Sequence, residues 1–174
     1  MNKQTLKNNL SERHNSFISN MHNLTDEEFV SCKNEKWSAG QQLEHIYLSV
    51  KPVRQILGLP RFTLKLIWGK ANRESKSYDE LVKKYIYKLE KGGRATGRFI
   101  PKVVSIEKRD KLNVELKNEI NKLNSILDKF TEEELDYFIL PHPLLGKLTL
   151  REIMYFTIYH VEHHEALTKR NLIL

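Results

Sequence analysis

The sequence has few of the residues that cross-link or interrupt a polypeptide. Cys32 is the only cysteine among 174 residues, so no disulfide can form within the chain, and a single thiol argues against thiolate zinc sites. We expect Cys32 to be an incidental, partly buried residue rather than a nucleophile. Glycine and proline number only seven and five. Because no strong period-two pattern of hydrophobic residues occurs either, the sequence favours helices over strands.

Long hydrophobic runs are absent as well. No apolar stretch approaches membrane-spanning length, and the polar beginning MNKQTLKNNLSERHN does not have the pattern of a secretory signal peptide. We therefore expect a cytoplasmic protein with no membrane partner. Hydrophobic residues make up 40% and charged residues 29% of the chain, as in an ordinary globular protein. The length suits a single domain over residues 1–174.

Positive charge is concentrated in one part of the chain. Residues 61–109 contain 14 basic and 5 acidic residues, a balance of +9, whereas the remainder contains 15 basic and 17 acidic residues. Such a segment could bind an anionic ligand or a nucleic acid. It has neither a nucleic-acid-binding motif nor aromatic residues at stacking intervals. We therefore interpret it as a solvated surface insertion and expect no nucleic-acid partner.

Helix starts are well marked. A hydroxyl residue followed three positions later by Glu or Gln predicts a capping box, in which each side chain accepts the backbone N–H of the other residue. This pattern occurs at Thr25–Glu28, Ser38–Gln41, Ser77–Glu80, Thr131–Glu134 and Thr149–Glu152. The main helices that we predict span residues 3–21, 38–57, 110–130 and 149–172, with Pro52 as the place for a bend in the second.

These helices predict an all-α fold, a four-helix bundle with a long, partly helical insertion at residues 58–109 between the second and third helices. The third helix carries an apolar stripe formed by Leu112, Leu116, Ile120, Leu123 and Leu127. The insertion contains a further amphipathic helix, whose apolar face comprises Tyr78, Leu81, Val82, Tyr85, Ile86 and Leu89. The stretch GGRATGRF, residues 92–99, predicts a flexible turn and lacks the spacing of a phosphate-binding loop.

Histidines form the clearest chemical pattern. Two of the seven, His160 and His164, lie four residues apart in the last predicted helix and share one face. The rest of that face is mostly apolar, with Ile153 before the pair and Leu167 after it. Both imidazoles should therefore point inward, where each needs a hydrogen bond or a metal ion. Two such rings can chelate one ion, although two hydrogen-bonded core histidines would give the same pattern.

A third ligand would come from another helix. His45 lies among apolar residues in the first half of the second predicted helix. Alone it would be interpreted as a core histidine, but the late pair makes it the natural partner. Three histidines leave coordination positions open, as in catalytic sites. We predict one divalent transition metal ion (zinc, nickel, iron or copper) at His45, His160 and His164. His163 and His142 are candidates for supporting these ligands, with packing or surface roles as the alternative.

Three stretches make the chain similar to the DinB-like family of small metal-binding four-helix proteins. They are KWSAGQQLEHIYLS at residues 36–49, HPLLGKLTLRE at 142–152 and YFTIYHVEHHEAL at 155–167. The resemblance implies a four-helix bundle, a homodimer, and metal ligands at His45, His160 and His164. It also implies a thiol-dependent transferase or isomerase that uses bacillithiol, mycothiol or glutathione, or a metal-dependent hydrolase. The long basic insertion departs from the shorter members of the family.

The sequence leaves three functions open. An enzyme could use the metal ion to activate water for hydrolysis, or a thiolate for transfer to a small-molecule substrate. Arg94, Arg98 and Lys102 in the insertion could then attract the carboxylates of a small thiol or of another acidic substrate. The same three ligands could instead serve a non-catalytic metal-binding or stress-response module. An anionic-ligand or nucleic-acid binder that uses the basic insertion is the third hypothesis.

Overall fold

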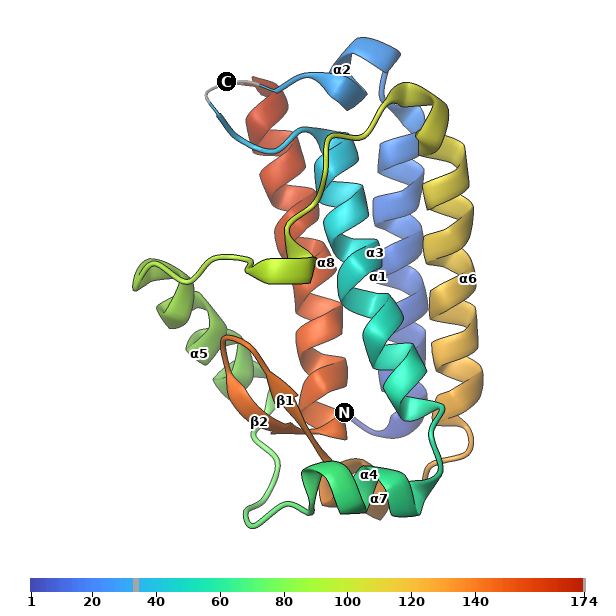
Figure 1. Ribbon diagram of the computed structural model, residues 1–174, viewed down its shortest axis with the longest axis vertical. Coiled ribbons are helices and arrows are strands. Elements are labelled where there is room, and N and C mark those ends of the chain that lie inside the picture. Colours follow the sequence, from blue (N-terminus) through green and yellow to red (C-terminus); the bar gives the residue numbers. More distant parts are fainter. Residues whose placement is uncertain (33–34, 174) are drawn as a thin grey trace.

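The computed structural model describes residues 1–32 and 35–173, and this part of the chain is mostly helical. Four long helices lie side by side (Figure 1): α1 (Lys3–Asn23), α3 (Ala39–Leu57), α6 (Arg109–Leu127) and α8 (Leu150–Ile173). Helix α3 packs against α6 and α8, and α1 packs against the same two helices. All four predicted main helices are therefore present, with ends that lie within three residues of the predicted ones.

The directions of the long helices explain the long connection between α3 and α6. In Figure 1, α1 and α8 run upward whereas α3 and α6 run downward, so α3 and α6 are parallel neighbours. A chain that leaves the lower end of α3 must return to the upper end before α6 can begin. Residues 58–108 make this crossover. On the way they contact α8 through α5 (Tyr78–Glu90) and α3 through a 3-10 turn (Gly97–Phe99).

The predicted capping boxes form at all five positions. At the start of α3, the Ser38 hydroxyl accepts the N–H of Gln41 at 3.2 Å, and the Gln41 side chain accepts the N–H of Ser38 at 3.0 Å. The boxes at residues 25 and 131 open only short helices, α2 (Asp26–Val30) and α7 (Glu132–Tyr137). Pro52 lies inside α3, which nevertheless continues to its predicted end.

The crossover contains two helices where the sequence indicated one. Helix α4 (Arg61–Trp68) follows α3 at the base of the molecule, and α5 is the predicted amphipathic helix. Leu81 and Tyr85 of α5 are buried, as predicted, but Ile86 is 39% exposed. One residue turns a helix by about 100°, so the position after Tyr85 rotates away from α8.

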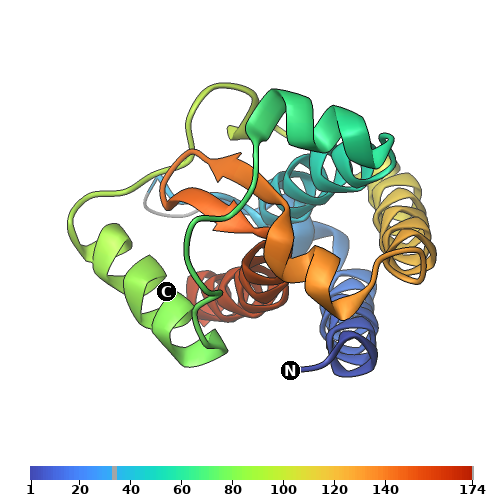
Figure 2. The ribbon, with the colours of Figure 1, turned by 90° about the horizontal axis from the view of Figure 1, so that it is seen from below.

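A small antiparallel sheet accompanies the helices, and the chain keeps the predicted all-α class. Strands β1 (Ile139–His142) and β2 (Gly146–Thr149) pair so that Ile139 faces Thr149 and His142 faces Gly146. Each strand has four residues, which is too short for a period-two pattern to stand out. The hairpin turn spans residues 143–145, and Gly146, which follows it, has a φ of +79° that favours glycine. It packs against α8 and α4 (Figure 2).

The core is shared by the four long helices. The predicted apolar stripe of α6 is buried throughout, and α8 is buried on most of its circumference between Leu150 and Val161. Cys32 corrects an expectation, because its thiol is exposed rather than partly buried. None of the helices in the described ranges is both long enough and apolar enough to cross a membrane.

Candidate metal centre

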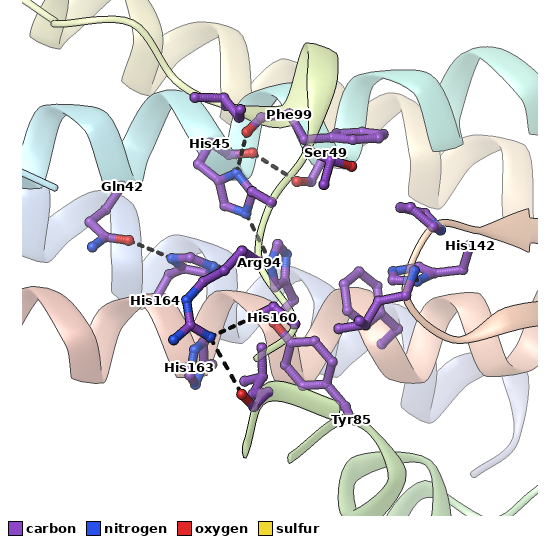
Figure 3. Close-up of a pocket in the computed structure, with 18 of the residues that line it drawn as sticks. Gln42, His45, Ser49, Tyr85, Arg94, Phe99, His142, His160, His163 and His164 are labelled. Atoms are coloured by element: carbon purple, nitrogen blue, oxygen red, sulfur yellow. Dashed lines mark hydrogen bonds between the residues drawn. The ribbon is translucent and has the colours of Figure 1, made fainter. Parts of the chain in front are cut away.

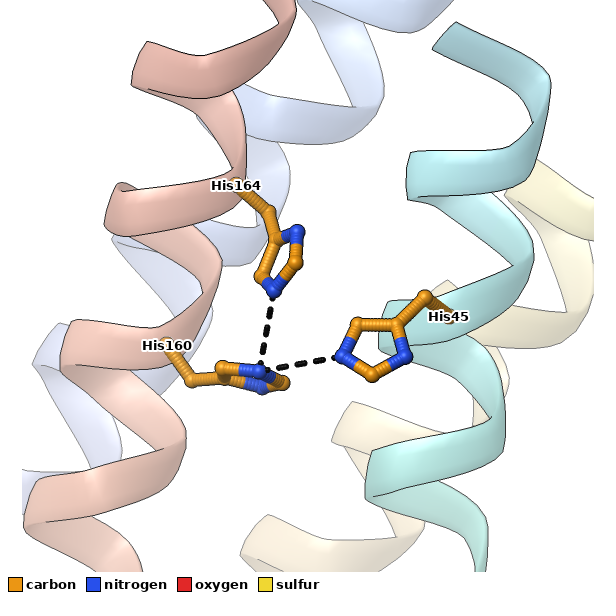
Figure 4. A group of neighbouring side chains, drawn as sticks. All are labelled: His45, His160 and His164. Carbon is orange, nitrogen blue, oxygen red and sulfur yellow. Dashed lines mark hydrogen bonds between the residues drawn. The ribbon is translucent and has the colours of Figure 1, made fainter. Parts of the chain in front are cut away.

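The three predicted ligands meet between α3 and α8 (Figure 4). His45 extends from α3, and His160 and His164 extend from α8 one helical turn apart. Each of the three residues is only 5% exposed. The inward orientation predicted from the apolar face of the last helix is therefore confirmed. We refer to these residues below as the three-histidine cluster.

The Nε2 atoms of the cluster point toward one another. His160 Nε2 lies 3.2 Å from His45 Nε2 and 3.0 Å from His164 Nε2. The candidate ligand atoms of the three residues all lie within 4.8 Å of one another. Two nitrogens bound tetrahedrally to one zinc ion, at 2.0–2.1 Å each, are separated by about 3.3 Å. The observed spacing is therefore close to what one shared ion requires.

Hydrogen bonds on the far side of two rings determine which nitrogen faces the cluster. His45 Nδ1 donates to the carbonyl oxygen of Phe99 at 2.7 Å, and His164 Nδ1 donates to Gln42 Oε1 at 2.5 Å. Both oxygens can only accept, so each Nδ1 carries the proton of a neutral imidazole and each Nε2 presents a lone pair. Two lone pairs thus face His160 Nε2, an arrangement that a cation among the three rings would stabilise.

Burial keeps the three imidazoles neutral. Removal from water lowers the pKa of His45 and holds the pKa of His160 and of His164 well below 6.5. The neighbouring histidines add to the depression at His160, whereas the hydrogen bond to Phe99 opposes it at His45. A metal ion binds the neutral imidazole, so all three side chains are in the ligating form at neutral pH.

The cluster forms part of the wall of a cavity of about 920 Å³ (Figure 3). Much of the remaining wall is apolar, and side chains of α3, α8 and the hairpin supply it. The charged residues on the wall are Lys36, Arg94, Arg98, Arg170 and Glu35, four cations against one carboxylate. Within residues 1–32 and 35–173, no carboxylate, thiol or further imidazole joins the cluster as a fourth ligand. Three donors beside a cavity are typical of catalytic rather than closed structural sites.

The other residues predicted for the site lie outside the cluster. Arg94 and Arg98 line the cavity, whereas Lys102 is not part of the wall and donates its backbone N–H to the Glu44 carboxylate. His163 lines the cavity with its ring centroid 5.2 Å from that of His164. In the described part of the chain, it makes no hydrogen bond to the cluster.

His142 lies at the hairpin end of the cavity (Figure 3). Its Nδ1 accepts the backbone N–H groups of Leu144 and Leu145, each at 3.1 Å. The Phe156 ring contacts two imidazoles, with centroids 4.2 Å from His142 and 4.6 Å from His160. His142 therefore approaches the cluster through an aromatic ring rather than through a hydrogen bond. Burial lowers its pKa to about 4.

Three groups that surround the cluster were missed by the sequence reasoning. Gln42 precedes His45 by three residues on the same face of α3, and this spacing was its one sequence signal. The Phe99 carbonyl belongs to the crossover, and a backbone oxygen has no sequence signature. Trp37 lies just before the Ser38 cap and places its ring 5.0 Å from the ring of His45.

Comparison with known proteins gives one match. The family model described as the DinB superfamily matches residues 9–167, which is most of the chain. No curated protein and no solved structure matches the sequence.

Proposed function

Because the chain belongs to the DinB superfamily, we propose that it is a metal-dependent enzyme that holds one divalent transition metal ion through His45, His160 and His164. The observation that carries this proposal is the convergence of three Nε2 atoms at the wall of a large cavity. The four-helix-bundle class fits the side-by-side packing of the long helices, and imidazole donors suit zinc, nickel or iron.

The chemistry of the site follows from its open side. A divalent ion held by three imidazoles lowers the pKa of a bound water or binds a thiolate, so it can serve hydrolysis or thiol transfer. We place thiol transfer first, because the cavity wall has four cations and one carboxylate and a small thiol that carries carboxylates would complement them. Arg94 and Arg98 are the cations from the insertion that we assign to this attraction.

The protein's own groups would orient the ligands and keep water from their far sides. Phe99 and Gln42 hold the Nδ1–H groups of His45 and His164, which fixes the direction of both Nε2 lone pairs. Trp37 covers the two rings, with centroids 5.0 and 6.3 Å from theirs. Such support makes the donor set rigid before any ion binds.

Elemental analysis of the purified protein tests the metal assignment. The wild-type chain should contain about one equivalent of a transition metal, and His45→Ala and His160→Ala should each lose it. His22→Ala is the matched control, because His22 is an exposed histidine of α1. Full metal content in His160→Ala would refute the assignment. The loaded protein is then screened for conjugation of bacillithiol, mycothiol or glutathione to electrophiles and for hydrolysis of esters and amides.

A non-catalytic metal-binding module is the second candidate. The hydrogen bond from His45 to Phe99 connects the cluster to the crossover, so an ion could serve mainly to fasten that segment. Metal-dependent stabilisation without turnover in either screen would favour this function. We also expect a homodimer, and light scattering gives the mass that tests it.

The insertion gives little support to a nucleic-acid binder. Its cations have separate partners: Arg61 contacts Glu134, Arg73 contacts Glu152, and Lys84 contacts the Leu145 carbonyl. A binder of this kind requires a continuous basic face and an affinity that falls steeply with salt. Binding to duplex DNA that weakens as the salt concentration rises would support this hypothesis.

A further inference from the structure

The hairpin end of the cavity presents a hydrogen-bond donor with a fixed position. His142 is the last residue of β1, and its ring lines the cavity beside the apolar side chains of Leu140 and Phe156. Its Nδ1 accepts the N–H groups of Leu144 and Leu145. A nitrogen that accepts two hydrogen bonds carries no proton, so the neutral ring has its proton on Nε2.

The turn of the hairpin selects this tautomer. A proton on Nδ1 would face two backbone N–H donors and break both hydrogen bonds, which disfavours the other tautomer and the imidazolium alike. The Nε2–H group has no acceptor among the described residues. The protein thus presents a neutral, oriented donor beside the apolar side chains of Leu140 and Phe156, and a ligand oxygen is its natural partner.

The surroundings of this donor favour a negatively charged acceptor. Lys84 donates to the Leu145 carbonyl at 2.8 Å, and its charge contributes to the lowered pKa of His142. The pKa of Lys84 is itself lowered by burial and by a surplus of nearby cations. These charges are Lys76, Arg73 and Lys88, opposed by Glu152. The cavity wall itself carries four cations and one carboxylate, and Lys84 lies behind the hairpin turn, so a bound carboxylate would complement the positive surroundings.

We propose that His142 is a substrate-binding residue whose Nε2–H donates a hydrogen bond to the carboxylate of a small acid with an apolar body. The body lies along Phe156, whose ring contacts both His142 and His160, and the other end of the acid reaches the three-histidine cluster. This assignment rests on the proposed function, because it takes the cluster as the reacting end. The substrate class is therefore an apolar-bodied carboxylic acid.

Octanoate and 1-octanol test the carboxylate, because they share an alkyl chain and differ in charge at one end. Calorimetric titration of the metal-loaded full-length chain should show octanoate binding roughly ten- to a hundredfold more tightly, as expected for a hydrogen bond to a charged group. Equal affinities, or no octanoate binding at millimolar concentration, would overturn the proposal.

The variant His142→Asn separates the donor from the turn. An asparagine side-chain oxygen can accept the same backbone N–H groups in an Asx turn, but it places no donor where Nε2–H stands. Octanoate affinity should fall to that of 1-octanol, while melting temperature and metal content stay at wild-type values. His22→Asn, at an exposed position of α1, controls for loss of a histidine. Wild-type octanoate affinity in a folded His142→Asn protein contradicts the assignment.

Nuclear magnetic resonance of the wild-type chain gives a second test that does not depend on how the variant folds. Long-range proton–nitrogen correlations of His142 should show a protonated Nε2 and an unprotonated Nδ1, and octanoate should shift the Nε2 signal. A proton on Nδ1, or an Nε2 signal unmoved at saturating octanoate, rejects the proposal.

The two proposals fail in different ways. If the cluster binds metal as expected but octanoate affinity does not depend on His142, only the substrate assignment is wrong. If His45→Ala and His160→Ala retain full metal, the proposed function is wrong whatever octanoate does.

Discussion

At the residue scale, Gln42 shows how a neutral side chain can orient a candidate metal ligand. Its Oε1 accepts the Nδ1–H of His164 and so directs the Nε2 lone pair of that ring into the cluster. We predict that Gln42→Leu weakens metal affinity about ten- to a hundredfold, as loss of such a supporting group does elsewhere. Competition with a chromogenic chelator measures the change. Gln4→Leu, on the exposed face of α1, should leave the affinity unaltered; equal affinities in the two variants would count against the role of Gln42.

His14 makes a separate prediction about stability and pH. Its Nδ1 donates to the Leu10 carbonyl at 2.8 Å, its Nε2 has no partner in the described chain, and burial lowers its pKa to about 4. Because the folded pKa lies below the unfolded value of 6.5, the unfolded chain takes up the proton first as pH falls. Stability is therefore full above about pH 6.5 and declines between about pH 6.5 and 4, by about 3 kcal/mol in total.

Urea unfolding of metal-free wild type and His14→Leu at pH 7 and pH 5 checks this expectation. The other buried histidines contribute to both proteins, so the difference between the two pH dependences isolates His14. The wild type should lose about 2 kcal/mol more than His14→Leu between the two pH values. Identical losses would show that His14 does not control acid stability.

The sequence predicted the side chains of the site better than their supports. His160 and His164 were recognisable because a spacing of four on an apolar helix face has one geometric meaning, and His45 gained its meaning from them. The Phe99 carbonyl could not be predicted, because any residue at that position supplies the same oxygen. Lys102 was chosen for its charge alone, and its side chain is not part of the cavity wall.

At the element scale, one carboxylate joins three segments. Glu152 is fully buried at the start of α8, where it accepts both NH groups of Arg73 at 2.7 Å, the backbone N–H of Lys76 at 2.8 Å and that of Thr149 at 3.0 Å. The capping box of α8 thereby also fastens the segment that leads into α5.

We predict that Glu152→Ala lowers the free energy of unfolding by about 3 kcal/mol. The substitution removes a helix cap and leaves Arg73 without its buried partner. Glu12→Ala is the control, because Glu12 is an exposed carboxylate of α1 and should change stability by less than about 0.5 kcal/mol. Equilibrium unfolding in urea measures both; similar values for the two variants would contradict the role given to Glu152.

The helices that the sequence indicated were those with a side-chain cap or a long apolar stripe. Helix α4 has neither, since it begins after Pro60 without a capping side chain and is eight residues long. The hairpin was missed because its four-residue strands are stabilised by packing against α8 and α4 rather than by a local pattern. Local chemistry thus located most elements, whereas tertiary contacts decided the rest.

At the scale of the whole molecule, the cluster joins α3 to α8, two helices that are far apart in sequence. An ion that binds only the folded chain stabilises it by about 2.7 kcal/mol at a concentration of 100 times Kd. We predict that the stoichiometric metal raises the melting temperature of the wild-type chain and that the chelated protein loses this gain. His160→Ala should melt at one temperature with or without metal, whereas His22→Ala should respond like wild type. Calorimetry distinguishes these outcomes.

The sequence did not predict the directions of the helices. It indicated an insertion between the second and third helices but not the path of that insertion through the fold. The parallel arrangement of α3 and α6 requires the crossover. This route takes Phe99 past His45, a contact that depends on the arrangement of all four long helices and on no local pattern.

That contact has a consequence for how fast metal can exchange. The crossover turn Gly97–Phe99 accepts a hydrogen bond from Nδ1 of His45, a proposed ligand, so an ion held by the cluster would dissociate only when this turn moves away. We therefore expect the protein to release its ion to a chelator far more slowly than its affinity alone implies. A protease cut between Gly92 and Gly93 should increase the rate of metal release. An unchanged release rate after the cut would show that the turn does not slow metal exchange.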